Sequence, residues 1–410
     1  MSVALGLFCR SCNRIIPETD FRTNCETCQT PLELVYDIKK LKKNLRKKNL
    51  LEISASLLKV WQHILPINNP KLIERVSIGE TCTPLVKSTT IGPAANIKTL
   101  HFKLEMGPTQ SLKDRGASLC ALKALELGFN TLCVASSGNN AASVSAYAAK
   151  AGLRAIVFIQ KDASPSKIFK MLAYGARVVR VDGDMSAASR LCSEMLQRHH
   201  WMQAGGPNPY RLTAKRTAAY EIVYQIGGRV PDAVFIPCGG SAGMVSAYRG
   251  FSEMVEAGII PSIPRLIGVQ LKACDPITQA FEAGQDRVQP VEKKPSFSDA
   301  LMNNTPYWGN QALQAVRQSD GLMVSVSDEE VADMIRELGS TEGLFVEPAG
   351  AVSAAGFKKL AGGGFLSRTH TAVCMLTGHG VNAPQAAFQS AALPEIVLPE
   401  IEAIESYLAG

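Results

Sequence analysis

Lys113 is the position of this chain whose neighbours most directly suggest chemistry. It lies in the run GPTQSLKDRG at 107–116, just before an Ala/Leu-rich stretch that predicts a helix over 117–127. The positive end of that helix and the adjacent Arg115 would disfavour the ammonium form of the lysine. A lysine with a lowered pKa is a nucleophilic amine near neutral pH, as Schiff-base chemistry requires. Most lysines near helix starts are solvated and inert, so this interpretation depends on the accompanying segments.

Three polar turns that contain glycine follow apolar, strand-like runs further along the chain. They are SSGNN at 136–140, CGGSAG at 238–243 and TGHG at 377–380. Glycines let backbone N–H groups approach a phosphate closely. In open α/β sheets, ligands bind where the carboxyl ends of the strands meet. Each turn taken singly is more often a plain loop, but their order along the chain favours one shared cofactor.

Together these motifs resemble those of the fold type II enzymes that use pyridoxal 5′-phosphate, specifically the threonine synthase branch. Members of that branch carry, in order, NPTGSFKDRG, SSGNT, NPYRLEG, a GNGGN-type loop, EPAGA and TGHG. This chain has corresponding runs, with NPYRLTA at 208–214 and EPAGA at 347–351. The resemblance covers about the whole chain. It implies an α/β fold with two parallel-sheet domains of the tryptophan synthase β-like architecture.

The resemblance also implies a role for each matching residue. Lys113 would carry the Schiff base and move protons at the substrate carbons, Asn139 would hydrogen-bond the phenolic oxygen of the cofactor, and Thr377 would face its pyridine nitrogen. The cofactor phosphate would be held by a glycine-rich loop, made of Gly239, Gly240, Ser241, Ala242 and Gly243. An amino-acid substrate would be held by five polar residues, Ser136, Ser137, Asn140, Asn208 and Arg211.

Some assignments leave a structural alternative open. Arg211 could equally cap a helix or pair with Glu221, and a role for Lys215 in binding substrate is a weaker prediction. His379 and Glu347 are expected to be structural residues of turns.

The chain departs from the family pattern mainly at positions that face the substrate. Gly107, Gln110, Leu112 and Asn140 stand where the family generally has other residues, and the pair at 205–206 is Gly-Gly instead of Asn-Ser. The resemblance implies a threonine synthase-type reaction, O-phospho-L-homoserine and water to L-threonine and phosphate. The departures leave open a relative that performs β- or γ-replacement or elimination on another O-activated amino acid, such as O-phosphoserine. A serine/threonine dehydratase and a non-catalytic binding protein are less favoured.

Residues 1–36 predict a separate small module. Cys9 and Cys12 form one CxxC pair, and Cys25 and Cys28 form a second. Four thiolates in two such pairs can enclose a tetrahedral Zn²⁺, and a module this small needs such a staple in place of a core. The alternative is a ribbon whose cysteines stay free or oxidise. Because all four positions would be filled, we expect a structural zinc.

Composition favours a cytoplasmic enzyme. The chain has 410 residues, of which 46% are hydrophobic, so it can bury a large core. It has no apolar run long enough to span a membrane, and its first residues lack a secretory signal. Its 11 scattered cysteines are typical of reduced intracellular thiols.

The net charge of +7 is concentrated in one short segment, since residues 39–48 carry seven Lys or Arg. The segment could bind a polyanion, but the interleaved leucines favour a solvated connecting helix, so nucleic-acid binding is not expected.

Alternating strand and helix patterns predict how the chain is divided. Residues 37–120 and 206–410 would form a large cofactor-binding α/β domain, and 121–205 a small mobile α/β domain. Family members are commonly dimers, which implies a homodimer.

Overall fold

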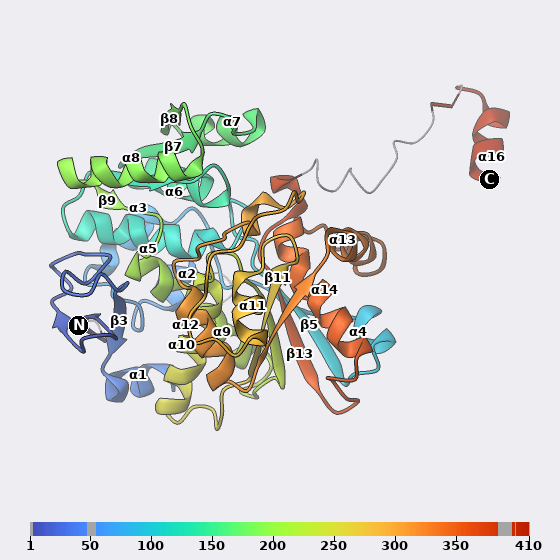
Figure 1. Cartoon of the computed structure of the whole chain (residues 1–410), viewed down its shortest axis with the longest axis horizontal. Coiled ribbons are helices and arrows are strands. Elements are labelled where there is room, and N and C mark those ends of the chain that lie inside the picture. Colours follow the sequence, from blue (N-terminus) through green and yellow to red (C-terminus); the bar gives the residue numbers. More distant parts are fainter. Residues whose placement is uncertain (1–2, 47–54, 384–395, 398, 410) are drawn as a thin grey trace.

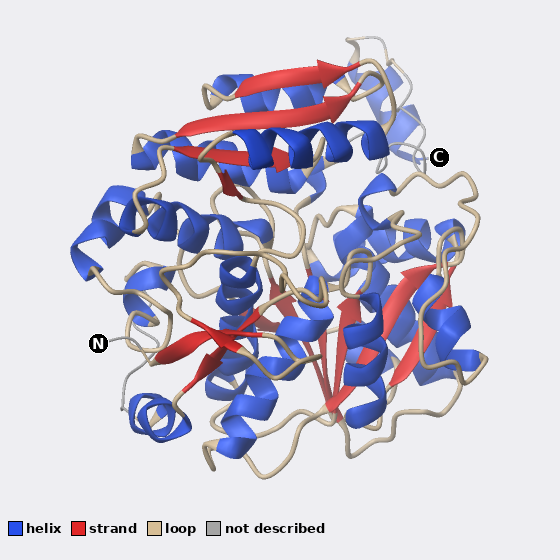
Figure 2. Ribbon diagram, turned by 60° about the vertical axis from the view of Figure 1, so that its left-hand side comes forward, coloured by secondary structure: helices blue, strands red, loops and turns tan. Residues whose placement is uncertain are grey.

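The computed structural model describes residues 3–46, 55–383, 396–397 and 399–409. Its strands form three sheets, which Figure 1 and Figure 2 show as separate groups surrounded by helices. The smallest sheet is antiparallel, has the order β2-β1-β3 and belongs to the N-terminal module. Its strands are β1 (Ala4–Phe8), β2 (Ile15–Ile16) and β3 (Glu33–Tyr36).

The predicted basic helix is present as α1 (Ile38–Leu45), which begins at an Asp37 cap. Leu41 and Leu45 are buried, whereas Lys39, Lys40 and Lys43 are exposed. The helix therefore has the solvated basic face that the leucine spacing favours. The last two lysines of the basic run, at 47 and 48, lie outside the described residues.

A six-stranded sheet with the order β12-β11-β10-β13-β5-β4 forms the centre of the molecule. All neighbours are parallel except β4, which runs antiparallel to β5. The strands are β4 (Leu85–Lys87), β5 (Thr99–Leu104), β10 (Ala233–Pro237), β11 (Arg265–Leu271), β12 (Leu322–Val326) and β13 (Thr371–Leu376). Strand β10 is buried along its whole length, as expected for a parallel sheet covered on both faces.

The alternation of side chains along β10 divides the hydrophobic core in two. Val234 and Ile236 belong to one apolar cluster, and Ala233 and Phe235 belong to a second. Because successive side chains of a strand point to opposite faces, the two clusters cover opposite faces of the sheet. Apolar packing on both faces therefore fixes the positions of the strand ends.

A four-stranded parallel sheet with the order β8-β7-β6-β9 lies at the top of Figure 2. Its strands are β6 (Thr131–Ala135), β7 (Arg154–Gln160), β8 (Arg177–Val181) and β9 (Met202–Gln203). Helices α6 (Asn139–Ala151), α7 (Pro165–Ala173) and α8 (Met185–Arg198) accompany it. The α/β fold with two parallel-sheet units is thus confirmed, whereas the domain boundaries at 120 and 205 stay a prediction.

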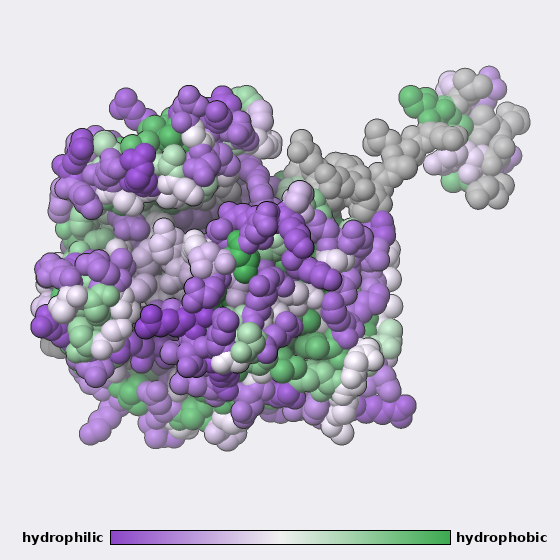
Figure 3. Space-filling model, in the orientation of Figure 1, coloured by the Kyte–Doolittle hydropathy of each residue, from purple (hydrophilic) through white to green (hydrophobic). Residues whose placement is uncertain are grey.

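The remaining helices pack around the two larger sheets. They are α2 (Leu57–Val60), η1 (Pro70–Leu72), α3 (Ile73–Val76), α4 (Ile91–Ala94), α5 (Lys113–Glu126), α9 (Pro209–Gln225), α10 (Ala242–Glu256), α11 (Pro276–Glu282), η2 (Asp299–Leu301), α12 (Gly309–Gln318), α13 (Asp328–Glu342), α14 (Pro348–Gly362) and η3 (Gly380–Asn382). Helix α16 (Ile401–Ala409) is drawn apart from the sheets in Figure 1. Within the part of the chain that the structure describes, no helix is long and apolar enough to cross a membrane. The face visible in Figure 3 is mostly hydrophilic.

The N-terminal module docks against α5 and α9. The ring of Phe21 stacks on that of Tyr210 with centroids 5.6 Å apart, and the Tyr210 hydroxyl donates to the Glu18 carbonyl at 3.2 Å. The Glu18 carboxylate forms an ion pair with Lys123 of α5. These contacts join the module to the first turn of α9, directly beside Arg211.

Candidate active site

Lys113 is the first residue of α5, and the loop before it is held against the end of β13. The Leu112 N–H donates to the Thr377 carbonyl at 3.0 Å, and the His379 N–H donates to the Gln110 carbonyl at 3.0 Å. The structure thereby brings the GPTQSLKDRG and TGHG segments together, as their shared role predicts. His379 caps η3 by accepting from the Val381 N–H, which is the structural role expected of it.

Burial lowers the pKa of Lys113 from its ordinary value. The Glu347 and Asp114 carboxylates oppose that shift, and the positive charge of Arg211 adds to it. No acceptor for the Lys113 ammonium is found among the described residues. The lowered pKa is therefore as predicted, and the amine remains available for a carbonyl carbon.

The predicted contribution of Arg115 to this pKa was wrong. Its guanidinium is neutralised in a buried network, where it donates to Glu105 at 2.6 Å and to Glu221 at 2.6 Å. Lys103 donates to the same Glu221 at 2.7 Å. The residue two positions after Lys113 thus ties α5 to β5 and α9, and the positive charge near the amine comes from Arg211.

Asn139, the first residue of α6, faces Glu347 at the start of α14. Its Nδ2 donates to both carboxylate oxygens, each at 2.9 Å. Glu347 is 5% exposed, and its burial raises its pKa while Asn139 and Lys113 act in the opposite direction. The expectation that Glu347 is only a turn residue was wrong, because its carboxylate lies in the site. Glu347 occupies the N-cap of α14 without capping that helix, which frees its side chain for another partner.

The predicted phosphate loop connects β10 to α10. Ser241 has φ 62°, and α10 begins without a side-chain cap, so the first N–H groups of the helix lack intrahelical acceptors. A Cβ at Gly240 would meet only Asn303 Nδ2 at 3.4 Å, which leaves room for a ligand beside the backbone. Uncapped N–H groups at a helix start suit a phosphate, so the loop of Gly239, Gly240, Ser241, Ala242 and Gly243 fits the phosphate of the cofactor. The Ser241 hydroxyl itself donates to the Gly239 carbonyl at 3.0 Å.

Thr377 lies at the end of β13 and is 8% exposed. Its hydroxyl donates to the Ala349 carbonyl at 3.3 Å. In this orientation it can only accept a hydrogen bond, from a protonated ring nitrogen, and it must rotate to donate to an unprotonated one. The predicted contact with the pyridine nitrogen stays a prediction.

Two of the predicted substrate residues are used inside the protein. Asn208 caps α9, where its Oδ1 accepts from the Arg211 N–H at 3.1 Å and its Nδ2 donates to the Gln203 carbonyl at 2.6 Å. Ser136 Oγ accepts from the Gly138 N–H at 3.3 Å. Ser137 lies in the same turn and is partly exposed. Of these three residues, Ser137 has the side chain least engaged by protein groups.

Arg211 and Asn140 form a contact between α9 and α6. Arg211 Nη2 donates to Asn140 Oδ1 at 2.7 Å, and Nη1 donates to the Gly206 carbonyl at 3.3 Å. The buried Nε has no hydrogen-bond partner. Glu221 pairs with Lys103 and Arg115, so the alternative of an Arg211–Glu221 pair was wrong. The guanidinium can still bind an anionic ligand, because its Nε–H has no acceptor among the described residues.

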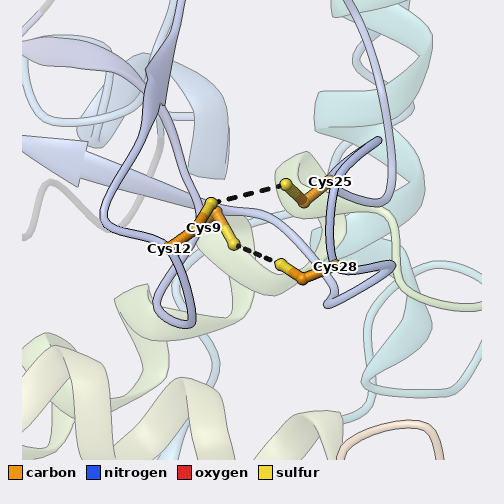
Figure 4. Close-up of side chains that lie close together, drawn as sticks. All are labelled: Cys9, Cys12, Cys25 and Cys28. Carbon is orange, nitrogen blue, oxygen red and sulfur yellow. Dashed lines mark hydrogen bonds between the residues drawn. The ribbon is translucent and has the colours of Figure 1, made fainter.

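The four predicted metal ligands converge in the N-terminal module, as Figure 4 shows. All four sulfur atoms lie within 4.8 Å of one another, with Cys9 and Cys28 at 3.2 Å and Cys12 and Cys25 at 3.6 Å. Sulfur atoms at the corners of a zinc tetrahedron are about 3.8 Å apart, given Zn–S bonds of about 2.3 Å. The donor set and its spacing fit a four-thiolate zinc site with no open position.

Comparisons with known proteins give the family and the fold of this chain. The family described as pyridoxal-phosphate dependent enzyme matches residues 76–378. The fold is similar to that of O-ureido-L-serine synthase, with a TM-score of 0.66 at 18% identity over 83% of this chain and 98% of that one. Threonine deaminase isoform 2 from Solanum lycopersicum gives a TM-score of 0.64 at 19% identity over 78% and 90% of the two chains. Fold and site together define a pyridoxal-phosphate-dependent enzyme of fold type II.

Full-length relatives narrow the class further. The chain is 33% identical over 408 residues to the threonine synthase of Methanosarcina acetivorans, with 98% of each chain covered. It is 32% identical over 390 residues to that of Methanocaldococcus jannaschii, over 94% of this chain and 95% of the relative. The chain belongs to the threonine synthase family.

Proposed function

We propose that this enzyme converts O-phospho-L-homoserine and water into L-threonine and phosphate. The observation that carries the proposal is a buried amine, Lys113, whose cationic neighbour Arg211 has no carboxylate partner among the described residues. A phosphorylated amino acid would supply the anion that Arg211 lacks. The near full-length similarity to two threonine synthases supports the same substrate.

Bound pyridoxal 5′-phosphate supplies an electron sink that acidifies C–H bonds of the substrate. Lys113 is the proposed anchor of the cofactor and, once released, the base and acid that moves protons at Cα and Cβ. Its lowered pKa suits both tasks near neutral pH. The loop at 239–243 would hold the cofactor phosphate, and Asn139, oriented by Glu347, would hold the cofactor ring.

Arg211 would orient the substrate phosphoryl group so that it leaves as phosphate. Asn140 of α6 fixes the guanidinium by accepting from its Nη2. Ser137 and Ser136 would contact the substrate carboxylate through the turn that begins α6. Asn208 would act indirectly, because its side chain holds the first turn of α9 and the Arg211 backbone.

We also propose that residues 121–205 close over the remainder of the chain as a small domain. Contacts between α6 or α7 and the central body support this: Asn139 reaches Glu347, and Lys170 of α7 reaches the Thr109 carbonyl at 3.1 Å and Asn382 Oδ1 at 2.7 Å. We further propose a cytoplasmic homodimer with a structural zinc in the N-terminal module.

The second candidate is replacement or elimination on another O-activated amino acid, such as O-phosphoserine. The pair Gly205 and Gly206 favours it, because these two positions beside Arg211 offer no side-chain hydrogen-bond donor to a substrate phosphate. A side chain is disfavoured at both positions, because a Cβ at Gly205 would lie only 2.9 Å from Val134 Cγ2 and Gly206 has a φ of 53°.

Assays of phosphate release, threonine and 2-oxobutyrate with O-phospho-L-homoserine and O-phospho-L-serine separate the candidates. Equal amounts of phosphate and threonine from phosphohomoserine support the first. Turnover of phosphoserine alone would replace it with the second, and 2-oxobutyrate as the main product would indicate a dehydratase.

A further inference from the structure

Lys215 is a buried lysine for which the described residues provide no hydrogen-bond acceptor. It lies in α9 one turn after Arg211, so the two side chains share one face of the helix. Lys215 is 5% exposed and Arg211 is 8% exposed. Burying an ammonium group without a partner is costly. A buried lysine in this state favours the neutral amine and becomes a cation when an anion binds beside it, so its position indicates a site for an anionic ligand.

Two other buried lysines of this protein do have partners. Lys103 donates to Glu221 and to the Thr83 carbonyl, and Lys123 forms ion pairs with Glu18 and Glu126. The buried carboxylates of Glu105 and Glu221 form ion pairs with Arg115 and do not accept a hydrogen bond from Lys215. The difference is local to α9 and is not a general property of the buried lysines.

The face of α9 that carries Lys215 lies against the start of α5. A Cβ at Gly116 would lie 3.1 Å from Arg211 Cβ, so the helices touch one turn beyond Lys113. Burial lowers the pKa of Lys215 well below its ordinary value, and the positive charges of Arg211 and Lys113 add to this shift. Cys120 and Glu105 oppose it. The basic side chains of Lys113, Arg211 and Lys215 therefore lie close enough to affect one another's pKa values.

We propose that Lys215 completes, with Arg211, a subsite for the dianionic phosphoryl group of the substrate, separate from the cofactor-phosphate loop at 239–243. The proposal deepens the proposed function and rests on it. Two cationic groups match the charge of a dianion, whereas a carboxylate would need one. Gly205 and Gly206 offer no side-chain donors here, so Lys215 supplies one from the neighbouring helix. Lys215 is then a residue that determines specificity for a phosphorylated amino acid.

The test is calorimetric titration of inorganic phosphate into the enzyme loaded with pyridoxal 5′-phosphate, so that the cofactor already occupies its own loop. Loss of one charge-assisted hydrogen bond corresponds to a loss of affinity of about 10-fold or more. We expect this loss in Lys215→Met and affinity within about 3-fold of the parent in Lys215→Arg. The exposed Lys150 of α6 provides the matched control, and Lys150→Met should bind phosphate like the parent.

Folding is monitored by thermal unfolding of each loaded variant. Replacing a buried amine that has no hydrogen-bond acceptor by an apolar chain should leave the midpoint of thermal unfolding unchanged or raise it. If Lys215→Met does not fold, Lys215→Gln is measured in its place.

Unchanged phosphate affinity in Lys215→Met, or no phosphate binding by the parent, would overturn the subsite. Weaker binding of pyridoxal 5′-phosphate in the variant would overturn it too, by assigning Lys215 to the cofactor. If threonine is formed but phosphate affinity does not depend on Lys215, the subsite is wrong and the proposed function is retained. If phosphate affinity depends on Lys215 but phosphohomoserine is not turned over, the subsite is retained and the proposed function is wrong.

Discussion

Asn139 and Glu347 join the two larger sheets of this enzyme across its active site. Asn139 begins the helix that follows β6, Glu347 precedes the helix that packs on β13, and their side chains meet through two hydrogen bonds of 2.9 Å. The same carboxylate acts on the charge of Lys113. Its position therefore affects the orientation of Asn139 and the pKa of the lysine together.

Gly378 leaves the space that Glu347 occupies, because a Cβ at this position would overlap the carboxylate. We predict that Gly378→Ala displaces Glu347 and lowers kcat/KM by about 10-fold or more, since the charge-assisted contacts are lost. The measurement is steady-state kinetics at constant cofactor occupancy. Gly339→Ala in α13 is the matched control, because its Cβ meets nothing within 4 Å, and it should leave activity unchanged. Full activity of Gly378→Ala would mean that the Glu347 carboxylate is not needed where the structure places it.

We predict that Glu221 makes the stability of this enzyme depend on pH. Arg115 and Lys103 outweigh the effect of burial and lower the pKa of Glu221 from an ordinary 4.5 to about 2. A carboxylate whose pKa is depressed by folding stabilises the protein above its unfolded pKa. That stabilisation should therefore be lost as pH falls from about 4.5 to about 2. Denaturant unfolding across this range measures the loss.

Removal of the Glu221 charge isolates its contribution. Glu221→Gln should lower the free energy of unfolding at pH 7 by about 3–5 kcal/mol, because it leaves buried cations without their partner. It should also flatten the acid dependence. The exposed Glu282 provides a control, and Glu282→Gln should keep the parental profile. An equally steep acid dependence in Glu221→Gln would assign the pH effect to other groups.

The N-terminal module should support the first turn of α9 through Phe21 and Tyr210. We predict one zinc per chain by elemental analysis and loss of that zinc in Cys25→Ser. Loss of the metal should unfold the module, since small four-cysteine modules depend on zinc for folding. Phosphate affinity should fall as well, because Tyr210 adjoins Arg211. Retention of phosphate affinity without zinc would separate the module from the active site.

The motifs predicted the fold class and the segments that meet in the site, because each strand, glycine-rich turn and helix start has a local sequence pattern. The contacts of Glu347 and Arg115 could not be predicted in that way, and a substrate role for Lys215 was only a weaker prediction. These contacts join residues far apart in the chain, Glu347 with Asn139 and Arg115 with Glu221. For Lys215, the described residues offer no hydrogen-bond acceptor. Residue type and spacing along one helix contain no information on which charges are paired across helices.

The most direct test of the central claim is the visible absorption spectrum of the enzyme with pyridoxal 5′-phosphate, followed by addition of O-phospho-L-homoserine. The account predicts a Schiff-base absorption band that is absent in Lys113→Ala, spectral change with the substrate, and threonine and phosphate in equal amounts. Lys167→Ala, at a lysine of α7, controls for loss of an unrelated amine. A band that persists in Lys113→Ala, or the absence of any band in the parent, would contradict the assignment of Lys113 as the anchor of the cofactor.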